Sequence, residues 1–189
     1  MSVFEHVAVA ISIILGLGVT TLLTAALDLF RHRRELRFHW VPLTWALLIF
    51  WLHLQFWWAL GLLGQVDEWS HGNFLLAIAL AVSLFSAASL IFPSRASTDA
   101  NDLEEFFRRE GKWGCAATAI VYLLLIPALH SFWQLPLVSF ASLAAFVNVL
   151  LITGVLVSRW PLLTNVLTVL AVGVQLVFQQ FTFVPILQL

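Results

Sequence analysis

The sequence predicts an all-α fold, a polytopic membrane helix bundle with six transmembrane helices plus a short cytoplasmic interfacial helix. Of the 189 residues, 61% are hydrophobic and only 10% are charged, whereas a soluble domain carries about 25% charged residues. Uncharged stretches of the length that crosses a bilayer, about 20 residues, recur along the whole chain. Too few polar residues remain to cover a water-facing surface, which excludes a soluble globular protein. The net charge of −1 excludes an electrostatic nucleic-acid binder.

The six expected spans form a single transmembrane domain, 1–189. The fourth uncharged stretch, 113–158, is twice as long as one helix requires and carries Pro127 and Pro136 around a polar patch. We therefore divide it into two helices. The stretches lack the alternating period of barrel strands. The expected spans are 7–29, 40–63, 73–92, 113–131, 137–158 and 162–186.

Lysine and arginine predict the orientation. All nine of them fall in the connections after the first, third and fifth spans, and the opposite side carries none. Cytoplasmic loops are enriched in these residues. We therefore expect a multi-pass inner-membrane protein with both termini periplasmic. The first six residues contain Glu5 and no lysine or arginine, so the first apolar stretch is expected to be a retained span and not a secretory signal.

The connection between the third and fourth spans predicts the interfacial helix, over 102–110. Asp102 is placed to cap it, Glu105 stands three residues on in capping-box spacing, and Gly111 is a stop signal. Three apolar side chains would face lipid on the cytoplasmic surface: Leu103, Phe106 and Phe107. The alternative is that Phe106 and Phe107 dock a cytoplasmic partner.

A ladder of small residues runs along the first span. Ser12, Gly16, Thr20 and Thr24 stand at four-residue intervals. Such ladders let helix backbones approach closely. The spacing predicts a packing seam against another span or against a second copy in a homo-oligomer, with the lining of a solute path as the alternative.

Polar side chains within the spans predict a polar core or path. An amide or an imidazole cannot be left unpaired in hydrocarbon. We expect Gln55 and Gln175, both near mid-membrane, to face the bundle interior, either as hydrogen bonds between helices or as the lining of a path. The candidate residues are His53, Gln55, Asn148, Asn165, Thr168, Gln175 and Gln179.

No enzyme signature stands in the chain: metalloprotease, nucleophile-elbow, phosphate-loop and dinucleotide motifs are all lacking. Cys115 is the single cysteine, which leaves no partner for a disulfide or a paired-thiol metal site. We expect no catalytic residue, cofactor or metal. Three histidines expected near the outer face keep a haem or metal site open as a third possibility: His6, His71 and His130.

Three functions remain open. The first is a small channel or transporter-like bundle with a polar path, and the second is a non-catalytic scaffold or accessory subunit held together by the same polar groups. The third is a redox protein that uses the outer histidines. A membrane-crossing hydrated cavity would favour the first, and a dry core would favour the second.

Three short segments carry a resemblance: Phe4-Glu5-His6, Gly16-Leu17-Gly18 and Gln55-Phe56-Trp57-Trp58. Through these segments, the first two spans resemble a group of small bacterial multi-pass inner-membrane proteins without an assigned function. The resemblance implies the same membrane-embedded helical fold and implies no activity.

Overall fold

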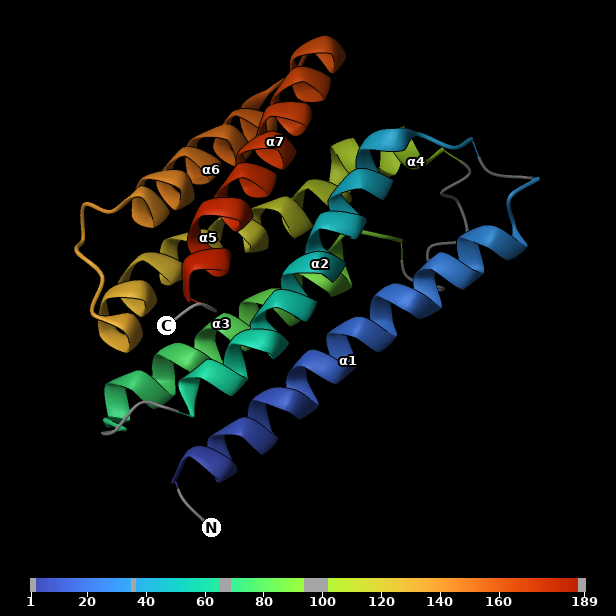
Figure 1. Ribbon diagram of the computed structural model, residues 1–189. Coiled ribbons are helices and arrows are strands. Elements are labelled where there is room, and N and C mark those ends of the chain that lie inside the picture. The colour runs from blue at the N-terminus through green and yellow to red at the C-terminus, as the bar shows by residue number, and fades with distance from the viewer. Residues whose placement is uncertain (1–2, 35–36, 65–68, 94–101, 187–189) are drawn as a thin grey trace.

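The computed structural model is an all-α bundle (Figure 1), and it describes residues 3–34, 37–64, 69–93 and 102–186, with the side chains of residue 3 and of 179–186 outside that description. Six of its helices are long and apolar enough to cross a membrane. The helices are α1 (Val3–Arg31), α2 (Trp40–Leu63), α3 (His71–Leu90), α4 (Leu103–Phe106), η1 (Phe107–Gly111), α5 (Lys112–Trp133), α6 (Phe140–Val157) and α7 (Pro161–Ile186). The prediction of six spans is confirmed, and each observed span lies within a few residues of its expected range.

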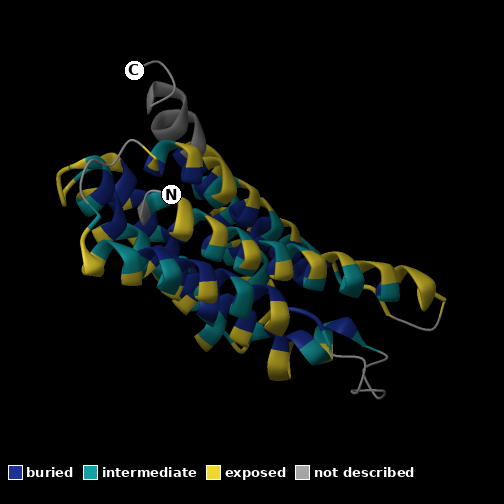
Figure 2. Cartoon of the chain, turned by 90° about the horizontal axis from the view of Figure 1, so that it is seen from below, coloured by how far each residue is buried: buried dark blue, intermediate teal, exposed yellow. Residues whose placement is uncertain are grey.

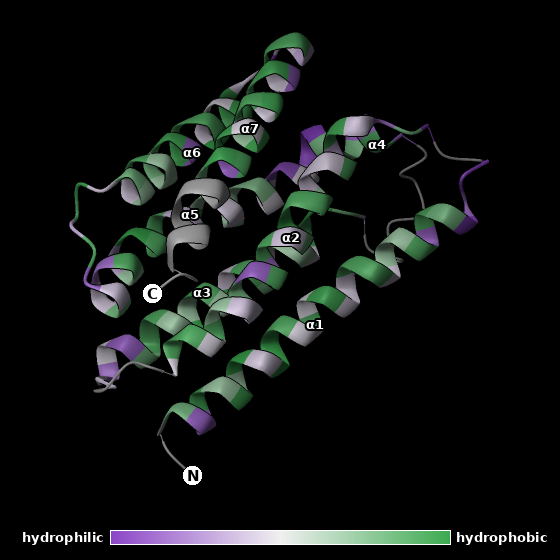
Figure 3. Ribbon diagram, in the orientation of Figure 1, coloured by the Kyte–Doolittle hydropathy of each residue, from purple (hydrophilic) through white to green (hydrophobic). Residues whose placement is uncertain are grey.

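Five of the long helices pack in sequence, α1 on α3, α3 on α5, α5 on α6 and α6 on α7, while α2 lies between α1 and α7 with lighter contacts to both. The outward surface is exposed and the side chains between the helices are buried (Figure 2). Hydrophilic residues lie mostly at the two ends of the bundle (Figure 3). One end holds the α1–α2, α3–α4 and α6–α7 connections, and we call it the basic end because every described lysine and arginine lies there.

Helix ends follow local sequence signals. Ser70 caps α3 by accepting a hydrogen bond from the Asn73 amide, and Ser139 caps α6 in the same way. Pro161 is the first residue of α7, a position whose N–H would have no hydrogen-bond partner within the helix. The division of the long apolar stretch is confirmed, although Pro127 stays inside α5 and the helix ends at Gln134, which takes a left-handed conformation with φ 53°.

The short helix before α5 begins as predicted but does not lie apart from the bundle. Asp102 accepts hydrogen bonds from the Glu104 and Glu105 amides. Gly111 does not stop the helix, because a turn of π-helix carries the chain directly into α5. The buried Leu103 and Phe107 belong to the core. The expectation that these two side chains face lipid is therefore wrong, and Phe107 is not available to dock a partner.

A close seam of small residues joins α3 and α5. A Cβ built on Gly114 would lie 3.0 Å from the backbone of Ile91, so only glycine permits this approach. Ala77, Ala81 and Thr118 are fully buried along the same two helices. This is the packing that the sequence led us to expect on the first span, and it occurs on a different pair of helices.

Candidate functional site

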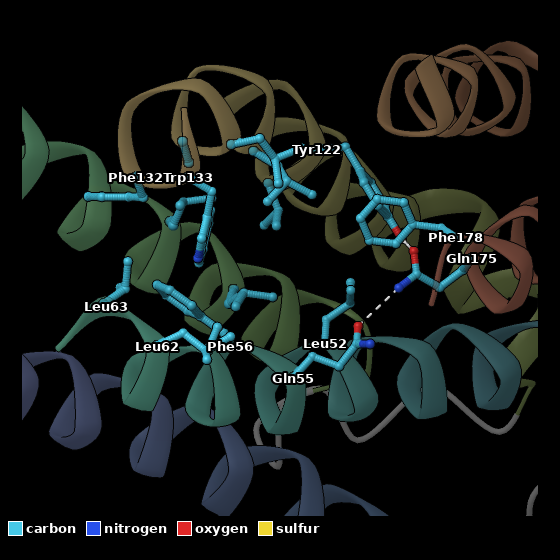
Figure 4. Close-up of a pocket in the computed structure, with 17 residues that line it drawn as sticks. Leu52, Gln55, Phe56, Leu62, Leu63, Tyr122, Phe132, Trp133, Gln175 and Phe178 are labelled. Carbon is cyan, nitrogen blue, oxygen red and sulfur yellow. Dashed lines mark hydrogen bonds between the residues drawn. The ribbon is translucent and has the colours of Figure 1, made fainter. Parts of the chain in front are cut away.

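Three polar side chains from three helices form a hydrogen-bonded chain in the interior (Figure 4). The Tyr122 hydroxyl on α5 donates to Gln175 Oε1 on α7 at 2.7 Å. Gln175 Nε2 in turn donates to Gln55 Oε1 on α2 at 3.0 Å. Tyr122 and Gln175 are buried and Gln55 is partly exposed. We call this set the Gln–Tyr chain; as expected, both glutamines face the interior, and the bond that joins their amides leaves neither one unpaired.

A second bond joins α2 to α7 nearer the basic end. The Trp45 indole N–H donates to the Thr168 hydroxyl at 3.2 Å, and both side chains are buried. Trp45 stands ten residues before Gln55, about 15 Å along the helix. The lightly packed α2 is thus held to α7 by polar bonds at two depths.

A cavity of about 80 Å³ lies beside the Gln–Tyr chain, between α2, α3, α5 and α7. On α2 and α5 its lining runs from mid-helix to the end opposite the basic end. Aliphatic and aromatic side chains make nearly all of the wall, and its polar groups are the Gln–Tyr chain and the Trp133 indole N–H. Figure 4 shows Phe132 and Trp133 at one side of this space and the two glutamines at the other. The cavity is therefore a mainly apolar space with the Gln–Tyr chain at one end.

His53 lies away from the cavity. Its ring is fully buried, and its Nδ1 lies 2.8 Å from the Ile49 carbonyl oxygen, so Nδ1 carries the proton and donates. Its Nε2 is buried with no hydrogen-bond partner in the described part of the chain. A Cβ built on Gly18 of α1 would overlap Nε2 and lie 2.9 Å from Cδ2. His53 thus packs tightly on the α1 backbone and does not share a site with Gln55.

The remaining candidates are spread through the bundle. Asn148 Nδ2 donates to the Ala144 carbonyl in its own helix at 3.2 Å, and its buried Oδ1 has no described partner. Asn165 lies at the basic end, far along α7 from Gln175. Gln179 stands in α7, but its side chain lies outside the described residues. The six predicted residues whose side chains the structure describes therefore do not form one continuous polar path.

The ladder on the first span is not a seam within the chain. Gly16 has nothing within 4 Å of a built Cβ, and Thr20, which is exposed, donates back to the Gly16 carbonyl. Ser12 and Thr24 are only partly buried. The face of α1 that packs inside the bundle carries Val7, Ile11, Leu15, Gly18 and Leu22. The expectation of a seam against another span is wrong, and a seam against a second copy stays a prediction.

The three histidines expected near the outer face, His6, His71 and His130, do not form a cluster that could hold a metal ion among the described residues. The ring of His130 is engaged with the Leu135 carbonyl oxygen through Nδ1 at 3.0 Å, and His71 lies against the Phe74 ring. Within the described ranges, no three histidine, cysteine or carboxylate side chains lie close enough to hold a metal ion.

Sequence reasoning missed Tyr122 and the aromatic wall of the cavity. Tyr122 is the single tyrosine of the chain and stands mid-helix, where its hydroxyl needs a partner. That need was a usable signal. The contribution of Phe132, Trp133 and Phe178 to one cavity wall depends on how α5 and α7 pack, which periodicity alone does not give.

The fold and the site together define a multi-pass, all-helical membrane protein with an intramembrane cavity. No known protein family, curated protein or solved structure matches the chain. The functional argument therefore depends on the site itself.

Proposed function

We propose that this protein binds an apolar chain, such as the acyl tail of a lipid, in the cavity beside the Gln–Tyr chain. The observation that carries the proposal is the composition of the cavity wall, which is aliphatic and aromatic except at the Gln–Tyr chain. Such a wall offers an alkyl group dispersion contacts without any cost of polar desolvation. We regard the protein as a binding protein and not as an enzyme.

The volume favours a chain over a ring system. The cavity holds about 80 Å³, roughly half of an engineered cavity of about 150 Å³ that accepts benzene. A space of this size suits a few carbon atoms of a linear chain whose remainder extends into the bilayer.

This proposal narrows the transporter-like role that the sequence suggested. The amides expected to line a path are bonded to each other and to Tyr122, and a permeating ion would have to break those bonds. A carrier of lipophilic molecules agrees with the cavity better than an ion channel does. By the positive-inside rule, we orient the protein in an inner membrane with its basic end cytoplasmic and both termini periplasmic.

A non-catalytic scaffold is the second candidate, and the same hydrogen bonds favour it. Polar groups that satisfy one another across α2, α5 and α7 stabilise a bundle without any ligand. The two candidates differ in one respect: a scaffold does not require the cavity to be filled.

The experiment is photolabelling in lipid nanodiscs with a phospholipid that carries an alkyl diazirine in its tail. Ala128 and Leu129 line the cavity and are buried from the surrounding lipid, so adducts at these residues report a chain inside the protein. We expect such adducts in the wild type, and a several-fold loss in Ala59→Leu, which places three more carbon atoms into the cavity. Ala26→Leu, an exposed position on α1, is the matched control and should label as the wild type does.

Labelling confined to lipid-exposed positions would contradict the proposal and favour the scaffold. Equal labelling of Ala128 and Leu129 in Ala59→Leu and in the wild type would also contradict it, because the chain would then reach these residues by another route.

A further inference from the structure

A second, smaller pocket lies at the basic end, remote from the apolar cavity. It holds about 30 Å³ between the start of α2, the η1 turn and the α6–α7 connection. Val41, Phe107 and Pro161 form part of its wall, and unlike the cavity it is also lined by several charged and polar side chains. Those side chains are His39, Glu104, Arg108, Ser158, Arg159, Thr164 and Asn165.

The positive charges in this pocket are not neutralised. Arg108 and Arg159 form no ion pair with any carboxylate in the described part of the chain, and Glu104 lies 3.7 Å from His39 Nε2. Two guanidinium groups and one carboxylate leave a formal excess of one positive charge among these three side chains. The pocket therefore favours an anion.

Two polar atoms here are buried without a partner among the described residues, His39 Nδ1 and Asn165 Oδ1. A buried polar atom that lacks a hydrogen bond costs about 1–3 kcal/mol, so a group that supplied the missing bonds here would be bound favourably. The Asn165 amide can rotate to present its NH₂ group, and His39 Nδ1 donates in the tautomer that carries the ring proton on that nitrogen. Both side chains can then act as donors to one acceptor-rich group.

We propose that this pocket binds a phosphate group, as a phospholipid headgroup or as a free phosphate anion. Guanidinium groups bind phosphate oxygens in pairs of parallel hydrogen bonds. No described side chain caps the first turn of α2, which begins at the pocket wall, and its amide groups add positive potential. Trp40 and Trp160 are sequence neighbours of the pocket residues His39 and Arg159, with exposed fractions of 42% and 75%. Exposed indoles are typical of the headgroup level of a bilayer.

The experiment measures binding of two probes to the full chain. In nanodiscs, native mass spectrometry compares phosphatidic acid with uncharged diacylglycerol in a phosphatidylcholine background. In detergent, inorganic phosphate is titrated and the thermal unfolding midpoint is followed. We expect Arg108→Gln and Arg159→Gln each to raise the apparent Kd for the phosphate probe about tenfold, since each removes charge-assisted hydrogen bonds.

Two further variants separate binding from misfolding and from general surface charge. Arg109→Gln is the matched control, because Arg109 pairs with Glu105 at 3.8 Å and does not line the pocket; its Kd should change less than about twofold. Glu104→Gln removes the one carboxylate in the pocket and should tighten binding, an effect that a damaged fold would not produce.

Saturable binding of phosphatidic acid alone identifies a headgroup site, and saturable binding of inorganic phosphate identifies a site for the free anion. Either result supports the proposal when Arg108 and Arg159 carry the affinity. The absence of binding of both probes would overturn it. Equal losses in the Arg109→Gln control and in the two pocket variants would overturn it as well, because general surface charge would then explain the binding.

Discussion

The replacement Gln175→Leu tests the central polar contact of the bundle. Gln175 is 1% exposed and forms two hydrogen bonds, one as acceptor from Tyr122 and one as donor to Gln55. Hydrogen bonds between membrane helices contribute about 0.6 kcal/mol each on average. Loss of both costs about 1.2 kcal/mol, and the buried Tyr122 hydroxyl left without a partner adds to that. We expect the free energy of unfolding to fall by about 1–2 kcal/mol.

The order of the stability losses among related variants tests the reasoning more strictly than the loss in one variant. Gln55→Leu and Tyr122→Phe each remove one of the two bonds and should each cost about 0.6 kcal/mol, roughly half of the Gln175→Leu effect or less. Reversible unfolding in mixed micelles, followed by circular dichroism, measures all three. Thr153→Val is the control: Thr153 is exposed and donates only to the Val149 carbonyl of its own helix, so this change should be close to neutral.

A Gln175→Leu variant no less stable than Gln55→Leu would refute the reasoning. Such a result would mean that the bond from Tyr122 contributes nothing, or that the unfolded helices pair their polar groups equally well in the membrane.

Two further predictions concern packing and orientation. Gly18→Ala should destabilise the protein by about 1–3 kcal/mol, because the new Cβ would overlap the His53 ring, whereas Gly16→Ala has nothing within 4 Å to meet and should be neutral in the same unfolding measurement. Reporter fusions after Arg37 should read cytoplasmic and fusions after Gln134 periplasmic, since the basic end is expected inside; reversed readings at both positions would contradict the orientation.

The spans were predictable because the thickness of the bilayer fixes the length of an apolar helix that crosses it, and charged residues mark where each apolar stretch ends. The same rule wrongly separated the short helix from α5, because a run that begins with Asp102 and contains charged residues has the composition of a surface segment. In the structure, the Leu103 amide donates to the Arg37 carbonyl at 3.3 Å, and Leu103 and Phe107 are buried in the core. Spacing alone did not reveal that contact between distant connections.

The site was predictable in chemistry and only partly in geometry. The lipid hydrocarbon cannot form hydrogen bonds with an amide, so Gln55 and Gln175 were expected to need partners inside the protein. The structure pairs them with each other. The packing face of α1 was predicted wrongly because small residues such as Gly16 and Gly18 lie on different faces of the helix. In the structure Gly18 contacts His53, whereas a Cβ on Gly16 would meet nothing within 4 Å. Spacing ranks the faces of one helix, but it does not say which face the neighbouring helix meets.

The bonds between α2 and α7 have a consequence for biosynthesis. Gln55 meets Gln175 across 120 residues, and Trp45 meets Thr168 across 123. At about 5–20 residues per second, a ribosome needs roughly 6–24 s to complete that interval. Throughout it, α2 is without the partners that α7 supplies, and the insertion machinery or an earlier helix has to shelter its amide and indole. A chain that terminates before α7 keeps those polar groups unpaired, which marks it for membrane quality control.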